Sequence, residues 1–274
     1  MIKNLLSKFV SINPYEVFFL EEWKGEPANQ RVFQEIFSIQ GDVYRKQKGR
    51  RTIRFHMNGQ YYFAKIHEGV GWGEIIKNLM NLKFPVISAR NEWKAIRQFE
   101  KSGIPTTPIV GYGRRGLNPA RMKSFIITRE IKNAISLEDY CGDWNKNPPP
   151  FSRKKELIKK VAFLIKKMHE SGMNHRDLYL CHFLLAPDKH NDKETLYLID
   201  LHRVQIRQKV PQRWKVKDLG GLFFSAMDLC LTQRDLLRFI KYYEGRSIKE
   251  SLLENKRFWD KVRNRAMAMY IKIK

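Results

Sequence analysis

The sequence predicts an α+β protein whose first half is rich in strands and whose second half is mainly helical. In the first half, residues 51–57 and 60–66 alternate polar and apolar side chains around Asn58-Gly59, a strong short-range signal for a β-hairpin. In the second half, apolar side chains recur at the helical period across residues 157–168. The 274 residues are enough for one two-lobed domain or two small ones.

These patterns divide the chain into three segments. Residues 1–40 are expected to form a peripheral N-terminal segment, residues 41–131 a strand-rich N-lobe and residues 132–274 a helical C-lobe. Within the first segment, apolar residues between Ile2 and Val10 fall on one helical face. This face belongs either to an ordinary helix packed on the protein or to a helix that lies in a membrane interface.

In the N-lobe, the hairpin precedes two helices and a further strand. Lys65 lies near the end of the second hairpin strand. Residues 72–82 and 90–101 have helical patterns, and Glu92 lies in the first turn of the second helix. Its carboxylate either pairs with Lys65 or interacts with the helix dipole. Residues 125–131 form an apolar strand that enters a polar break.

The C-lobe begins with a short turn and a long helix. Ser152 is expected to cap this helix, and Gly172 is placed to end it. Residues 183–185 and 197–199 are predicted to form a pair of strands, and Asp200 terminates the second of them.

Two acidic residues in this lobe define the chemistry. Asp177 lies in His175-Arg176-Asp177, and Asp200 follows 23 residues later. This order is that of the catalytic core of the protein-kinase fold, in which the first acid orients or deprotonates the attacking hydroxyl and the second holds magnesium. The sequence therefore predicts a protein-kinase-like bilobal fold, with Asp177, His175 and Arg176 as catalytic residues and Asp200 as a metal ligand.

The same fold assigns the nucleotide-binding residues. Lys65, paired with Glu92, is expected to hold the α- and β-phosphates of ATP. The chain lacks a Gly-x-Gly-x-x-Gly loop and has instead a run of cations that includes Lys48 and Arg50. We expect these cations to replace some backbone contacts to phosphate. The backbone at Glu130-Ile131 would form the hinge that binds adenine.

Two departures from ordinary protein kinases bear on metal and acceptor. Five residues after Asp177, where those enzymes have a metal-binding asparagine, this chain has His182, which either ligates the metal or packs beside Phe183. Only 18 residues separate Asp200 from Asp218, which leaves little room for a long activation segment. A small-molecule or glycolipid acceptor therefore fits better than a protein acceptor, and Asp218 is expected to brace the catalytic loop.

Composition indicates anionic partners and a reducing compartment. The formal net charge is +24, which favours nucleotide phosphates, anionic lipid, phosphorylated glycolipid, nucleic acid or an acidic protein as partners. The three cysteines cannot fully pair and form no metal-binding spacing. No apolar run approaches the length of a membrane span, and we expect no signal peptide.

The chain also resembles the lipopolysaccharide core heptose(I) kinase family of Gram-negative bacteria between about Gly41 and Lys241. The resemblance is carried by these stretches: residues 74–79, 92–93, 135–141, 174–177, 181–185, 199–203 and 231–235. It implies a kinase-like fold, ATP and Mg²⁺ as cofactors, and phosphorylation of the inner-core heptose of lipopolysaccharide at the cytoplasmic face of the inner membrane.

Partners follow from the resemblance and the charge together. A phosphorylated glycolipid acceptor in an anionic bilayer would explain a wide basic surface, with residues 45–51 and 153–160 as candidate contacts. An acidic protein such as an acyl carrier protein is the rival explanation, and no nucleic acid is expected. Three alternatives remain: a kinase of another core sugar, a protein kinase, and a basic binding protein without catalysis.

Overall fold

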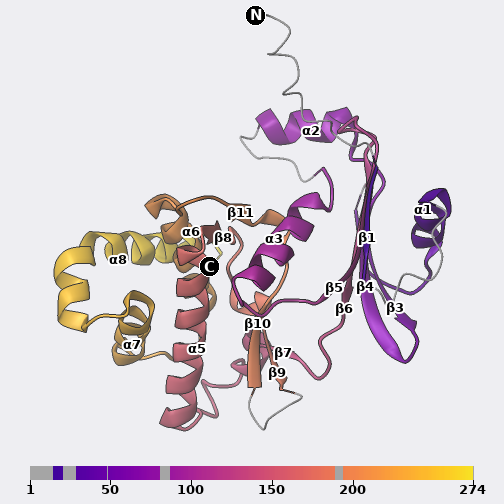
Figure 1. Cartoon of the computed structure of the whole chain (residues 1–274). Helices are drawn as coiled ribbons and strands as arrows, with labels where there is room; N and C mark the ends of the chain where they lie inside the picture. Colours follow the sequence, from indigo (N-terminus) through magenta and orange to yellow (C-terminus); the bar gives the residue numbers. More distant parts are fainter. Residues whose placement is uncertain (1–14, 21–28, 48, 81–86, 189–193, 274) are drawn as a thin grey trace, which may run out of the picture. The chain divides into compact units, whose positions relative to one another are not determined.

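The computed structural model describes residues 15–20, 29–47, 49–80, 87–188 and 194–273. The chain forms two compact units, each with its own secondary structure (Figure 1). The N-terminal unit comprises residues 1–93 and 108–130, and the C-terminal unit comprises residues 94–107 and 131–274. Residues 94–107, which the sequence analysis placed in the N-lobe, thus belong to the C-terminal unit.

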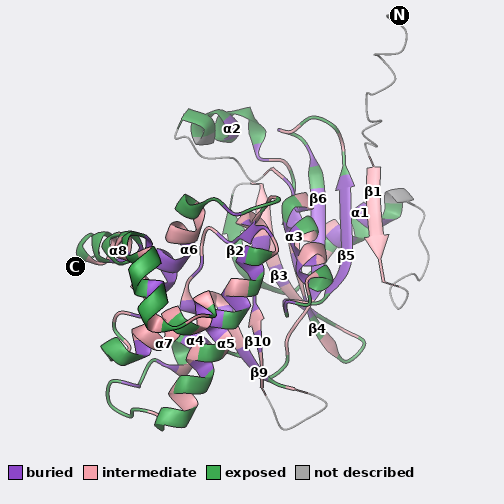
Figure 2. Ribbon diagram, turned by 60° about the vertical axis from the view of Figure 1, so that its left-hand side comes forward, coloured by how far each residue is buried: buried purple, intermediate pink, exposed green. Residues whose placement is uncertain are grey.

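The N-terminal unit is built on one antiparallel sheet in the order β1-β5-β6-β4-β3-β2. Its strands are β1 (Tyr15–Phe19), β2 (Asp42–Gln47), β3 (Arg50–Met57), β4 (Gln60–His67), β5 (Ile109–Arg115) and β6 (Lys123–Arg129). The predicted hairpin is β3-β4, and its turn residues Asn58 and Gly59 both have positive φ, at 50° and 73°. Those dihedrals suit a turn whose twist matches the strands. Figure 2 shows β5 and β6 as the buried centre of the sheet.

The described part of the segment before residue 40 forms an edge strand and a helix of this unit. Strand β1 pairs with β5, and helix α1 (Asn29–Ser38) lies on one face of the sheet (Figure 1). Phe33 of α1 is buried with its ring centroid 5.3 Å from that of Phe125. The amphipathic pattern at residues 2–10 lies outside the described residues.

Helices α2 (Gly71–Met80) and α3 (Arg90–Lys101) correspond to the two helices predicted in this region. Helix α3 has the predicted bounds and buries Ile96 and Phe99 completely. On α2, Ile75 is buried, whereas the other large apolar residues of the predicted face, Ile76, Leu79 and Met80, are more than half exposed.

The C-terminal unit is mainly helical, as predicted. Its elements include α4 (Leu137–Tyr140), α5 (Phe151–Glu170), α6 (Gln212–Ser225), α7 (Gln233–Glu244), α8 (Ile248–Ile271) and the 3₁₀ turns η3 (Leu180–His182) and η4 (Leu201–Arg203). The small sheets are β10-β9-β7 (Glu194–Leu198, Phe183–Pro187, Ile135–Ser136) and β11-β8 (Gln205–Ile206, Met173–Asn174). Helix α7 packs against α5, and α8 packs against α6. The described helices include none that is long and apolar enough to cross a membrane.

The ends of α5 differ in how well the sequence predicted them. The helix begins at Phe151 with Pro150 as its N-cap, so the prediction that Ser152 caps it was wrong. Pro150 (φ −52°, ψ 145°) places the N-cap two residues before the predicted one, and no side chain caps the helix. Gly172, with φ of 77°, follows the C-cap as predicted, because a left-handed residue ends a helix at little cost when it is glycine.

Candidate active site

In the N-terminal unit, β4 and α3 place Lys65 and Glu92 in contact. The Lys65 Nζ lies 2.7 Å from the Glu92 Oε1. The Glu92 side chain is 5% exposed and that of Lys65 is 28% exposed, so the pair is largely withdrawn from water. Of the two alternatives for Glu92, the structure therefore has the ion pair with Lys65 rather than a solvated carboxylate at a helix terminus.

The basic loop of this unit is a tight turn between β2 and β3. Gly49 has a φ of 72°, and a Cβ there would lie 2.2 Å from the carbonyl oxygen of Gly69. Arg50 follows at the start of β3 and is half-buried, and burial lowers the pKa of its guanidinium against an opposing attraction to Glu74. Lys48 lies outside the described residues.

The predicted hinge residues fall at the division between the two units. The Glu130 carboxylate accepts hydrogen bonds from the Arg54 Nε at 2.8 Å and Nη2 at 3.0 Å. Its backbone N–H donates to the carbonyl of Tyr61 at 3.0 Å, so this amide is not available to an adenine ring. Ile131 is the first residue of the following segment and belongs to the C-terminal unit.

In the C-terminal unit, a buried carboxylate holds the loop after β8. Asp218 of α6 has no solvent exposure and accepts hydrogen bonds from the backbone N–H groups of His175 and Arg176, both at 2.7 Å. The predicted bracing role of Asp218 is confirmed. The brace holds Arg176 in a left-handed conformation with φ of 76°, which is rare for an arginine and persists only where surrounding contacts enforce it.

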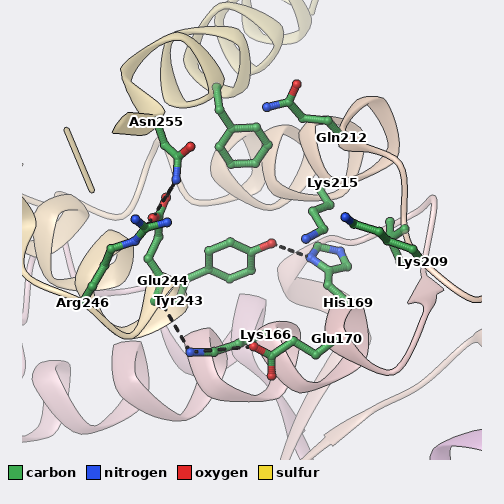
Figure 3. A pocket seen from close by; sticks show the side chains of 12 residues that line it. Lys166, His169, Glu170, Lys209, Gln212, Lys215, Tyr243, Glu244, Arg246 and Asn255 are labelled. Carbon is green, nitrogen blue, oxygen red and sulfur yellow. Dashed lines mark hydrogen bonds and ion pairs between the residues drawn. The ribbon is translucent and has the colours of Figure 1, made fainter. Parts of the chain in front are cut away.

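This brace is connected to a surface cavity, which Figure 3 shows. His169 of α5 lies 3.3 Å from Asp218 through its Nε2 and 2.8 Å from the Tyr243 hydroxyl through its Nδ1. The cavity has a volume of about 320 Å³ and is lined by residues of α5, α6, α7 and α8, including Lys166, Glu244 and the ring of Tyr243. The chain of hydrogen bonds thus runs from the catalytic loop through Asp218 to His169 and Tyr243, two residues that line the cavity.

His175, a predicted catalytic residue, is packed inside the unit. It has no solvent exposure, and its Nε2 donates to the carbonyl of Ile199 at 2.9 Å. Burial lowers the pKa of its imidazole below the usual 6.5, so the ring is neutral. This position rules out direct contact with a substrate and makes His175 a link between the catalytic loop and the strand that precedes Asp200.

The buried neutral state of His175 predicts a pH effect on stability. As the pH falls below about 6.5, His175 becomes protonated in the unfolded chain but stays neutral in the folded protein. The free energy of unfolding should therefore fall by up to about 1.4 kcal/mol per pH unit. A His175→Gln variant should lack this contribution and lose less stability between pH 7 and pH 5. Urea unfolding at each pH measures it, with exposed His56→Gln as control. Equal pH slopes for His175→Gln and the wild type would contradict the prediction.

Asp177 is held by an arginine that sequence reasoning did not assign. The Arg203 Nη1 lies 2.9 Å from both carboxylate oxygens of Asp177. Arg203 is the last residue of η4, three residues after Asp200, so one short turn connects the two acids. No local signal identifies this contact, because the two residues are 26 positions apart and meet only in the folded unit.

Asp200 and His182 lie close to each other in the same unit. The His182 Nε2 is 3.7 Å from the Asp200 Oδ2, and its Nδ1 is 2.7 Å from the backbone carbonyl of Asp177. Because a carbonyl only accepts, Nδ1 carries a proton, and Nε2 is the ring nitrogen on the side of Asp200. An imidazole nitrogen and a carboxylate oxygen side by side are both atoms that can ligate a cation. The second oxygen of Asp200 lies 2.8 Å from the His202 Nδ1.

This arrangement fits a magnesium ion that takes most of its ligands from elsewhere. The described residues contain no cluster of three or more His, Cys, Asp or Glu side chains able to hold a metal. Magnesium is usually bound through one or two carboxylates together with phosphate oxygens and water. Asp200 would provide the carboxylate if a magnesium ion binds here, and its left-handed backbone (φ 60°) is the kind of outlier found at functional sites.

These features define the class of the protein. A strand-rich unit with a Lys–Glu ion pair and a helical unit with a braced His-Arg-Asp loop are the parts of the protein-kinase-like fold. The family model described as "Lipopolysaccharide kinase (Kdo/WaaP) family" matches residues 34–243. The chain belongs to this family.

Relatives and a solved structure agree with that assignment. The chain is 47% identical over 236 residues to the lipopolysaccharide core heptose(I) kinase WaaP of Pseudomonas aeruginosa, covering 85% of this chain and 87% of the relative. Identity to the enzyme of the same name from Escherichia coli K12 is 47% over 232 residues, covering 84% and 86%. A solved structure of WaaP in complex with acyl carrier protein superposes with a TM-score of 0.78 at 39% identity, covering 93% of this chain and 99% of that one.

Proposed function

We propose that this protein transfers a phosphoryl group from ATP to heptose I of the lipopolysaccharide inner core. The proposal is carried by the identity of 47% over most of the chain to curated heptose(I) kinases. The two acids, the Lys–Glu pair and the braced loop supply what phosphoryl transfer needs, which is positioning and charge neutralisation.

The direct test is phosphate transfer from labelled ATP to purified core lipopolysaccharide. We expect incorporation into a core that carries heptose and none into a core that ends before it. Incorporation into the heptose-lacking core would identify another core sugar as the acceptor, and incorporation only into proteins would favour a protein kinase. Failure to hydrolyse or transfer phosphate with any of these acceptors would favour a binding protein without catalysis.

Roles follow for the residues of each unit. Asp177 orients the acceptor hydroxyl and takes its proton, and Arg203 fixes the rotamer of that carboxylate. Lys65, held by Glu92, contacts the nucleotide phosphates. Magnesium, when bound, neutralises charge on those phosphates, and Asp200 with His182 would hold it. Arg176 has a strained backbone and its guanidinium lies over the ring of Trp214, and we assign it to substrate binding rather than to proton transfer.

The Lys65 assignment predicts a specific kinetic defect. Lys65→Met keeps the length and apolar stem of the side chain but removes the charge, so it should raise the KM for ATP and lower turnover, with about 10- to 100-fold loss in kcat/KM. Steady-state kinetics at varied ATP measures it. Exposed Lys94→Met on the same helix as Glu92 is the control. Unchanged ATP kinetics in Lys65→Met would refute the assignment.

The His182 assignment predicts a difference between two replacements. Asparagine can offer an oxygen to a metal and alanine cannot, so His182→Asn should keep more activity than His182→Ala and need less added magnesium. Magnesium titrations of turnover and of ATP-induced thermal stabilisation measure this, with Asp200→Ala as the reference for a lost metal ligand. Equal magnesium dependence of the wild type and both His182 variants would indicate that the histidine only packs.

An acidic protein partner is a further part of the proposal. The similar solved structure contains an acyl carrier protein, and the net charge of +24 favours association with an acidic surface. We expect an acyl carrier protein to co-elute with this protein in size-exclusion chromatography at low salt and to separate from it as salt rises. Separate elution at every salt concentration would count against this partner.

The proposal also includes peripheral attachment at the cytoplasmic face of the inner membrane. The candidate contact at residues 153–160 is already largely neutralised: Arg153 pairs with Glu156 and Glu194, Lys154 with Asp235, and Lys160 with Glu156. Helix α2 fits a membrane better, because it exposes large apolar side chains: Trp72, Ile76, Leu79 and Met80. Sedimentation with anionic vesicles should weaken in Ile76→Ser/Leu79→Ser and persist in the matched control Leu252→Ser/Leu253→Ser. Absence of wild-type binding at low salt would reject membrane attachment.

A further inference from the structure

Trp214 of α6 is surrounded by cations of the C-terminal unit. The guanidinium carbons of Arg176, Arg207 and Arg213 lie 5.4, 5.6 and 5.6 Å from the centroid of its ring. The Lys217 Nζ lies 5.5 Å from it. An indole face attracts one cation readily, but four around one ring repel each other. We call these five residues the Trp214 cation cluster.

The cations of this cluster form no ion pair with a carboxylate among the described residues. Among the described residues, no ion pair joins Arg176, Arg213 or Lys217 to an acid, and Arg207 donates to the neutral side chains of Asn174 and Gln205. Asp177 and Asp218 attract Arg176 from a distance, and Asp177 is already held by Arg203. The cluster differs in this respect from Arg153, Lys154 and Lys160 of α5, which have acidic partners.

Burial and the close approach of these cations lower the pKa of two residues in the Trp214 cation cluster. Burial lowers the pKa of Lys217, and the charges of Arg176 and Arg203 lower it further. Burial likewise lowers the pKa of Arg176, and Arg203 adds to the effect. The charged forms of Arg176 and Lys217 are therefore less stable here than in water, and a bound anion would relieve both the repulsion and the lost hydration.

Buried donors without partners provide an independent sign of a missing ligand. The Trp214 Nε1 and the Arg176 Nε are both buried and make no hydrogen bond to the described residues. Buried N–H groups are almost always paired with protein, water or ligand. Two such donors within one cation cluster are suited to acceptor oxygens of an anion.

We propose that the Trp214 cation cluster binds an anionic group of the acceptor, a phosphate monoester or a sugar carboxylate, next to the hydroxyl that is phosphorylated. The proposal rests on the kinase function proposed above. The cluster includes Arg176, which directly precedes Asp177, and both Arg176 and Lys217 are attracted to the Asp177 carboxylate. An anion held there would bring a neighbouring sugar hydroxyl to the residue assigned to accept its proton, and the binding would depend on charge and not on which sugar carries it.

The test uses Arg213→Gln/Lys217→Gln, which removes two charges while leaving Asp177 and its brace in place. The matched control is Arg234→Gln/Lys241→Gln, two exposed cations of α7. We expect the cluster variant to raise the KM for core lipopolysaccharide by about tenfold or more and to leave the KM for ATP unchanged, because each charge-assisted hydrogen bond contributes substantially to binding. Equal acceptor KM values for the cluster variant, the control and the wild type would overturn the proposal.

A second arm separates the two sources of the anion. Enzymatic removal of the phosphate monoesters from the acceptor should abolish the difference between the wild type and the cluster variant if phosphate is bound. A difference that persists with the dephosphorylated acceptor assigns the cluster to a carboxylate instead.

Direct binding keeps the cluster testable even if the wild type transfers no phosphate to heptose. Inorganic phosphate should broaden its ³¹P resonance with the wild type and with the α7 control, and much less with the cluster variant. Loss of broadening only in the cluster variant supports an anion site independently of the acceptor, whereas equal broadening in all three proteins would overturn it.

Discussion

Replacing Asp177 with alanine should lower the turnover number for phosphate transfer by about 10²–10⁴-fold, the usual contribution of a positioned general base. The carboxylate is held in one orientation by Arg203 at 2.9 Å to both of its oxygens, and that orientation is what the reaction uses. The fold should survive, because the backbone of this loop is held by Asp218 rather than by Asp177. Turnover with saturating ATP and lipopolysaccharide measures the loss.

Two further measurements make this prediction specific. ATP with magnesium should still raise the melting temperature of Asp177→Ala, because the residue is assigned to the acceptor and not to the nucleotide. Exposed Asp143→Ala is the control and should keep wild-type turnover. Wild-type turnover in Asp177→Ala, or a loss that equals the loss of ATP binding, would remove Asp177 from the role of base.

Features with local signals were predictable from the sequence. The β3-β4 hairpin follows from alternation around Asn58-Gly59, and both turn residues adopt the positive φ that this pair favours. The bounds of α3 follow from periodicity and Gly103. The catalytic loop and Asp200 follow from motif spacing, which reflects the order of elements in the chain.

Features that depend on distant contacts were not predictable in the same way. In the sequence, strand β1 is only a short run with several aromatic residues. It becomes a strand by pairing with β5, about a hundred positions later. The Arg203–Asp177 contact and the neutralised cations at Arg153 and Lys160 depend on which side chains meet in the folded unit. Charge counted along the sequence therefore overstates some basic surfaces and conceals others, such as the one around Trp214.

Strain in the catalytic segments shows why these contacts exist. Arg176 and Asp200 both adopt left-handed backbone conformations, which cost of order 1–3 kcal/mol each in non-glycine residues. Local sequence does not favour either conformation. Arg176 is held by the carboxylate of Asp218, and His175 connects its loop to the backbone of Ile199, directly before Asp200. The contacts that hold the loop of Asp177 therefore also hold the segment that carries Asp200.

The stability of this arrangement should depend strongly on Asp218. Alanine at this position would leave the N–H groups of His175 and Arg176 buried without acceptors and would remove a partner of His169. The loss of a fully buried, multiply hydrogen-bonded carboxylate costs about 3–5 kcal/mol. For a chain of this size, the melting temperature should fall by roughly 10 °C.

Thermal unfolding followed by circular dichroism measures this loss, with Asp260→Ala, at a half-exposed side chain, as the control. Asp260 pairs with Lys256 on the surface of α8, and such pairs contribute at most about 1 kcal/mol. Asp218→Asn removes the charge and keeps the shape of the side chain. Its single amide oxygen can accept only some of the hydrogen bonds that the carboxylate accepts, and its NH₂ group would face a backbone N–H. It should therefore melt between the wild type and Asp218→Ala. If Asp218→Ala has the same melting temperature as the Asp260→Ala control, contacts other than this carboxylate hold the loop. Those contacts must then also hold Arg176 in its strained conformation.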